Sequence, residues 1–136
     1  MTDGGRLSVI IELDFRSDVP IARQIADAIT LRALGGALDE GSPLPDVREL
    51  ALQLQVNPNT VEAAYDFLLS ESVAELVSGT QNLVVARPPE STSAATREAF
   101  TRVMCALLDR ARRAGLPADE LRRIVEEAME GVDDGG

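Results

Sequence analysis

The sequence predicts a mainly α-helical fold that contains one β-hairpin and ends in a pair of helices. Three observations lead to this prediction. Two helix starts follow each other closely, with Asp46 and Asn57 as capping residues. Two short alternating runs, 73–77 and 82–86, flank a turn that contains glycine. A segment rich in proline and serine, 87–93, then precedes a long stretch of helical periodicity.

Composition restricts the chemistry. The 136 residues are 45% hydrophobic and only 3% aromatic, so we expect a core of aliphatic residues and alanine. The chain has no histidine and no lysine, which excludes histidine-containing metal sites, histidine-based catalysis and Schiff-base chemistry. Its one cysteine, Cys105, cannot form an internal disulfide and is expected to be a packed small side chain. Because no apolar run reaches membrane length and no basic residues followed by an apolar run open the sequence, neither a membrane span nor a secretory leader is expected. We therefore expect a cytoplasmic protein without catalytic residues, metal, cofactor or membrane contact.

The N-terminal part is predicted to be irregular up to the first helix. Residues 8–15 form a short strand at best. The first helix is expected to run to about Leu34, with Asp18 as its N-cap and Pro20 in its first turn. The glycines at 35–36 end it.

The next two helices are predicted to form a helix–turn–helix. Asp46 caps the first, with Glu49 completing a capping box. A tight turn at 55–56 follows, and Asn57 caps the second helix with Pro58 at its first position. The buried face of that helix is expected to consist of Val61, Ala64, Tyr65 and Leu68.

The hairpin and the tail complete the chain. A turn at 78–81, which contains Gly79, separates the two strands, and helices are expected at 94–114 and 118–129. The predicted organisation is an N-terminal segment 1–14, a winged helix-turn-helix domain 15–86, a linker 87–93, a helical dimerisation tail 94–131 and a disordered end 132–136. A helix–turn–helix followed by a hairpin is the winged helix-turn-helix arrangement, in which the second helix of the turn enters the major groove.

Two motifs resemble a known family. Residues 44–51 read L-P-D-V-R-E-L-A and residues 56–65 read V-N-P-N-T-V-E-A-A-Y, which is similar to the GntR family of bacterial transcription regulators. The opening helix fits as well, and the resemblance spans about residues 16–86. The two-helix tail, with Ala114-Gly115-Leu116 and then Glu120-Leu121, resembles the short dimerising tail of the YtrA-like branch. The residues after Ala86 are too few for the effector domain that larger branches carry.

The resemblance implies a homodimer that binds operator DNA. The residues that it implies at the DNA are Arg48, Asn57, Asn59, Thr60 and Gly79. Each also has a structural interpretation: an ion pair within the turn for Arg48, capping for the asparagines and threonine, and turn geometry for the glycine. The dimer is expected to form through an apolar stripe that is too large for an exposed face, made of Phe100, Val103, Met104, Leu107 and Ala111.

Several residues depart from the family pattern where the family touches DNA. Asp46 replaces a serine, Gln55 a small residue and Glu62 a position that is often basic, while the wing has no basic residue. Residues 15–85 hold four arginines and ten acidic residues, a net charge of −6. Because phosphate contacts need cations, this favours an alternative: a regulator-derived module that kept the fold and dimerisation, lost DNA binding and contacts a protein partner.

Overall fold

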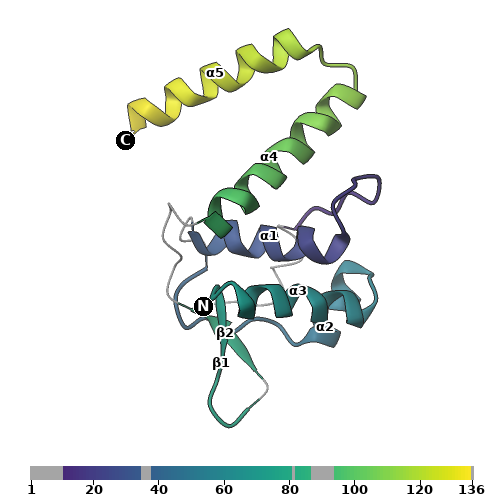
Figure 1. Ribbon diagram of the computed structural model, residues 1–136, viewed down its shortest axis with the longest axis vertical. Coiled ribbons are helices and arrows are strands. Elements are labelled where there is room, and N and C mark those ends of the chain that lie inside the picture. The colour runs from purple at the N-terminus through teal and green to yellow at the C-terminus, as the bar shows by residue number, and fades with distance from the viewer. Residues whose placement is uncertain (1–10, 35–37, 81, 87–93, 136) are drawn as a thin grey trace. The chain divides into compact units, whose positions relative to one another are not determined.

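The computed structural model describes residues 11–34, 38–80, 82–86 and 94–135. The elements are α1 (Ile21–Leu34), α2 (Val47–Leu54), α3 (Pro58–Ser70), β1 (Ala74–Leu76), β2 (Leu83–Val85), α4 (Ala94–Arg113) and α5 (Ala118–Gly135) (Figure 1). This order confirms the predicted fold class: a mainly helical chain with one two-stranded hairpin. The chain divides inside α4 into two compact units, the winged unit Met1–Val103 and the tail unit Met104–Gly136.

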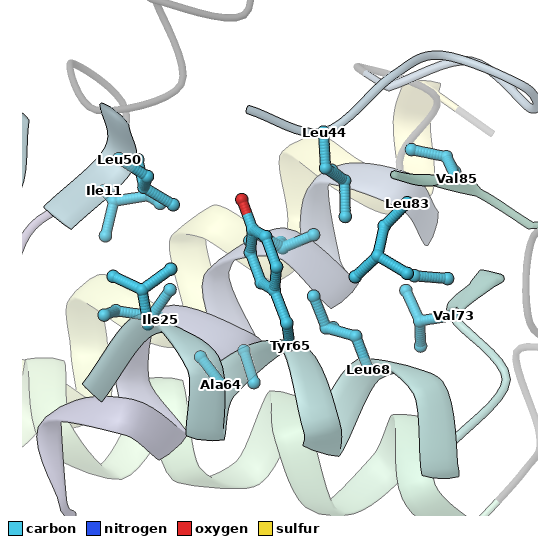
Figure 2. Close-up of a cluster of buried hydrophobic side chains, with 14 of the residues drawn as sticks. Ile11, Ile25, Leu44, Leu50, Ala64, Tyr65, Leu68, Val73, Leu83 and Val85 are labelled. Carbon is cyan, nitrogen blue, oxygen red and sulfur yellow. The ribbon is translucent and has the colours of Figure 1, made fainter. Parts of the chain in front are cut away.

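The core of the winged unit lies between α1 and α3, which pack side by side (Figure 1). Apolar residues one turn apart make this contact possible, because they share one face of each helix. Ile25 and Ile29 of α1 and the predicted stripe of α3 are buried. Tyr65 lies in the middle of the cluster and is surrounded by aliphatic side chains (Figure 2). The core is thus aliphatic, as composition predicts.

The hairpin is part of a slightly larger sheet. β1 and β2 are antiparallel, with Ala74 opposite Val85 and Leu76 opposite Leu83. On the other edge of β2, the Val85 N–H donates to the Ser42 carbonyl oxygen at 2.8 Å, and residues 41–44 run antiparallel to it. The sequence predicts only a turn-rich loop there, because pairing across forty residues leaves no local pattern.

Some boundaries differ from the sequence predictions. Of the strand expected at 8–15, residues 8–10 lie outside the described residues and residues 11–15 form no strand. α1 begins at Ile21, and the Pro20 carbonyl accepts its first helical hydrogen bond, so the residue before the helix is Pro20 and not the predicted cap Asp18. The predicted linker 87–93 lies outside the described residues. The winged unit instead extends into α4, where Ala99 is fully buried.

The tail unit contains the rest of α4 and α5. Gly115 has φ +108° and makes the turn between them, and the Leu116 N–H closes the end of α4 on the Ala111 carbonyl at 3.1 Å. α5 continues to Gly135, so the segment expected to be a disordered end is helical for most of its length. Cys105 is exposed, which contradicts the expectation that it packs. In the described part of the chain, no helix combines the length and apolar character needed to span a membrane.

Candidate nucleic-acid interface

The start of α2 is capped as predicted. Asp46 has extended backbone angles, φ −56° and ψ 146°, and its Oδ2 accepts a hydrogen bond from the Arg48 N–H at 3.1 Å. A carboxylate does this as well as the serine that the family pattern has here. The replacement therefore leaves the helix start intact and changes only the charge that this exposed position presents.

The turn between α2 and α3 also keeps its geometry. Gln55 is in the left-handed region, with φ 60° and ψ 46°. The N–H groups of Gln55 and Val56 donate to the carbonyls of Leu52 and Ala51 at 3.3 Å and 3.0 Å, which satisfies the last carbonyls of α2. Glycine adopts this conformation without strain, which explains the small residue of the family pattern. The glutamine therefore holds a left-handed conformation that costs a residue with a side chain more than it costs glycine.

The first turn of α3 is closed by its own cap. The Asn57 side-chain oxygen accepts from the Asn59 N–H at 2.8 Å, the Asn57 carbonyl accepts from the Thr60 N–H at 2.9 Å, and Pro58 has no N–H. The capping interpretation therefore holds for Asn57. The backbone donors at this end are occupied, so contacts with a ligand must come from side chains. Asn59 is exposed there, and Thr60 is half-buried.

The charged side chains around this surface are mostly acidic. Arg48 is exposed, and within the described ranges no residue forms an ion pair with its guanidinium. On α3, Glu62 and Asp66 are exposed and lie one turn apart. Arg23 is not available to a ligand, because it pairs with Glu71 at 2.8 Å.

The wing is a turn built from glycine and threonine. Gly79 has φ +79° and no atom within 4 Å of the place where a Cβ would stand, so its backbone conformation explains the glycine. Thr80, which sequence reasoning did not single out, holds the turn: its hydroxyl donates to the Val77 carbonyl at 2.9 Å and accepts from the Asn82 N–H at 3.1 Å. Leu76, at the end of β1, is 55% exposed.

Tyr65 connects α3 to the segment before α2 through a buried hydrogen bond. Its hydroxyl donates to the carbonyl oxygen of Pro45, the residue before the α2 cap, at 2.7 Å. Burial, followed by the charges of Asp46 and Glu49, raises the pKa of Tyr65. The phenol therefore stays protonated and keeps donating to the Pro45 carbonyl.

The predicted dimer stripe lies along α4. Phe100 and Leu107 are 53% and 54% exposed, while Val103, Met104 and Ala111 are half-buried. Spacings of three and four residues place them on one helical face. Further exposed apolar side chains follow on α5 at Ile124 and Met129.

Sequence reasoning missed a group of paired charges in the winged unit. Arg23, Asp27, Glu71 and Arg102 join α1, the end of α3 and the first half of α4. Hydrogen bonds with Glu71 and with Asp27 raise the pKa of Arg23 and of Arg102, respectively. The four-residue spacing of Arg23 and Asp27 was the available signal. Among the described residues, no cluster of acidic or cysteine side chains could hold a metal ion.

Several known transcriptional regulators are similar to this chain. The family described as "Bacterial regulatory proteins, gntR family" matches this chain over residues 21–84. The uncharacterized HTH-type transcriptional regulator YhcF of Bacillus subtilis (strain 168) is 31% identical over 117 residues, which cover 86% of this chain and 96% of YhcF. The HTH-type transcriptional repressor YtrA of the same strain is 41% identical over 70 residues, 52% of this chain and 54% of YtrA.

Other relatives are longer than this chain, which covers 17% of the probable rhizopine catabolism regulatory protein MocR of Rhizobium meliloti. A solved structure of YtrA from Sulfolobus acidocaldarius, a GntR-family transcription factor, is similar with a TM-score of 0.55 and 34% identity, over 74% of this chain and 98% of that one. The likeness to YhcF covers most of both chains, and the likeness to the GntR-family factor YtrA of Sulfolobus acidocaldarius covers nearly all of that protein. The chain therefore belongs to the gntR family of bacterial regulatory proteins and is a transcriptional regulator of its YtrA-like branch.

Proposed function

We propose that this regulator is a cytoplasmic homodimer that binds operator DNA through the exposed side chains at the start of α3 and acts by binding alone. The observation that carries the proposal is the intact helix–turn–helix: both caps and the left-handed turn are in place although the residues around them have changed. The acidic residues that replace those of the family pattern should therefore alter how strongly the protein binds DNA. The helix–turn–helix itself keeps the backbone geometry that DNA binding needs.

Asn59 and Thr60 are the proposed base-contacting residues. An asparagine side chain can bind the N6 and N7 positions of adenine, and a threonine can contact several bases. The exposed guanidinium of Arg48, at the second position of α2, is proposed to contact a phosphate. Gly79 is proposed to let the wing turn approach the DNA backbone, in addition to its role in the turn.

The acidic residues around the start of α3 determine how strongly we expect the protein to bind DNA. Each neutralised phosphate contributes roughly 0.9 to the slope of log affinity against log salt. With Arg23 occupied in an ion pair, few cations remain, so binding should be weak at physiological salt and depend mainly on side-chain contacts with bases.

The dimer is proposed to form through the stripe on α4. Its exposed members Phe100 and Leu107 are large apolar side chains that a second copy would cover. A homodimer places two α3 helices against two half-sites about one helical turn of DNA apart.

A mobility shift with DNA from the protein's own promoter tests the proposal. We expect a shifted band at about 50 mM salt that weakens only modestly at about 200 mM, because few counterions are released. A scrambled fragment of equal length is the control. No shift at the lower salt concentration would refute DNA binding and favour a module that acts through protein contacts.

A further inference from the structure

A buried carboxylate lies at the centre of the group of paired charges in the winged unit. The Asp27 side chain is 1% exposed. It accepts three hydrogen bonds: from Arg23 Nε at 3.0 Å, from Arg102 Nε at 2.8 Å and from Arg102 Nη2 at 3.0 Å. The Arg102 pair is bidentate, a geometry that fixes the orientation of both groups as well as attracting them.

The same network reaches the end of α3. Arg23 uses its two remaining nitrogens in a second bidentate pair, with both carboxylate oxygens of Glu71 at 2.8 Å. Glu71 is the C-cap residue of α3, and the Arg23 guanidinium lies 4.3 Å from the centre of the Phe67 ring of that helix. A continuous chain of charge-assisted contacts therefore runs from α3 through α1 to α4.

Removing Arg102 does not leave Asp27 without a partner. A buried carboxylate that loses every partner destabilises a fold severely, but Asp27 keeps Arg23, and Arg23 keeps Glu71. What Arg102 adds is the attachment of α4, whose first half also buries Thr96 and Ala99. Loss of Arg102 should therefore release the first half of α4 without unfolding the helix–turn–helix.

We propose that Arg102 is a positioning residue: through Asp27 it anchors the first half of α4 to α1, and the anchored helix sets the spacing between the two half-sites that a dimer recognises. The proposal rests on the proposed function. Phe100 and Val103, on either side of Arg102, belong to the predicted dimer stripe, so a loose anchor would let each reading helix move relative to the dimer contact.

The test compares Arg102→Gln with Arg97→Gln. Both remove one positive charge from the first half of α4, but Arg97 is exposed and takes part in no ion pair with a described residue. The first measurement is hydrogen exchange of the backbone amides of residues 94–103 in the full chain. Because hydrogen bonds between charged groups are involved, we expect protection to fall about tenfold in Arg102→Gln and to stay at the parent level in Arg97→Gln.

The second measurement is selection of operators whose half-site spacing varies by one to five base pairs. The parent and Arg97→Gln should prefer one spacing, whereas Arg102→Gln should bind several spacings with similar affinity. Its affinity for a single half-site should remain that of the parent, a result that a general loss of stability would not give.

The outcomes separate the two proposals. If hydrogen exchange of residues 94–103 is unchanged in Arg102→Gln, Arg102 does not anchor α4. If the preference for one half-site spacing is unchanged, the anchor has no role in recognition. If the parent binds no DNA, the proposed function fails and the spacing claim falls with it, while exchange still decides whether Arg102 anchors α4. Loss of half-site binding together with spacing preference would show that Arg102 supports folding and is not a positioning residue.

Discussion

The phenol oxygen of Tyr65 lies 2.7 Å from the carbonyl oxygen of Pro45 and donates a hydrogen bond to it. This bond joins the middle of the reading helix to the residue that precedes the cap of the helix before it. Both residues are buried, so the carbonyl has no water to replace a lost donor. This hydrogen bond therefore helps to hold α2 and α3 in the relative placement that the proposed DNA recognition requires.

Replacing Tyr65 with phenylalanine should lower the free energy of unfolding by about 1–2 kcal/mol, because the buried carbonyl is left without a donor. Urea denaturation followed by circular dichroism measures this. Ser70→Ala is the matched control, since it removes an exposed hydroxyl that also donates to a backbone carbonyl, that of Phe67 at 3.0 Å. Equal effects of the two changes would contradict the role given to Tyr65.

Replacing Gln55 with glycine should raise the free energy of unfolding by about 0.5 kcal/mol, because relief of left-handed strain exceeds the entropy cost of glycine. The control is Gln53→Gly at an exposed position in the last turn of α2, which should lower the free energy of unfolding by up to about 1 kcal/mol. The same denaturation experiment compares them. If both glycines destabilise the protein alike, the turn at Gln55 is not strained.

The helix–turn–helix could be predicted because its signals are local. Asp46 caps α2 through a residue two positions away, and Asn57 caps α3 in the same way. Such contacts are encoded in a few adjacent residues, and the apolar periodicity of α3 places Tyr65 and its neighbours in the core. The family resemblance depends on the same positions.

The ion-pair network could not be predicted in full, because its contacts span long stretches of chain. Arg102 pairs with Asp27 across 75 positions and Arg23 with Glu71 across 48, and a charge pattern does not show such partners. The pairing of residues 41–44 with β2 was missed for the same reason. The exposure of Cys105 depends on what covers α4, which periodicity along one helix does not determine.

Changing Asp46 to serine together with Glu62 to arginine should raise DNA affinity about tenfold at about 50 mM salt and steepen the salt dependence by one to two phosphate equivalents. The serine still caps α2, so the fold should be kept. The measurement is fluorescence anisotropy over a salt series. As a control, Asp109→Ser with Glu127→Arg makes the same charge change in the tail unit. Absence of binding in the reading-face variant would place the defect in the shape of the turn or wing.

Changing Leu107 to glutamate should shift the protein from dimer to monomer, because it places a charge in the apolar stripe. Light scattering with size-exclusion chromatography measures the mass. A point variant is cleaner than removal of residues 91–136, since the buried Ala99 belongs to the winged unit. Leu52→Glu is the control, because Leu52 is 81% exposed on α2. A Leu107 variant that stays dimeric would contradict the proposed dimer contact.

The central claim is that DNA is read by the side chains at the start of α3, and the most direct test is anisotropy of labelled promoter DNA at about 50 mM salt with the parent, Asn59→Ala and Thr60→Ala. We predict that the parent binds and that neither variant does, while the melting temperatures stay close because neither residue belongs to the buried stripe of α3. Arg48→Ala should bind more weakly to all sequences alike, as loss of a phosphate contact requires. Binding by the variants equal to that of the parent, or no binding by the parent, would contradict the account.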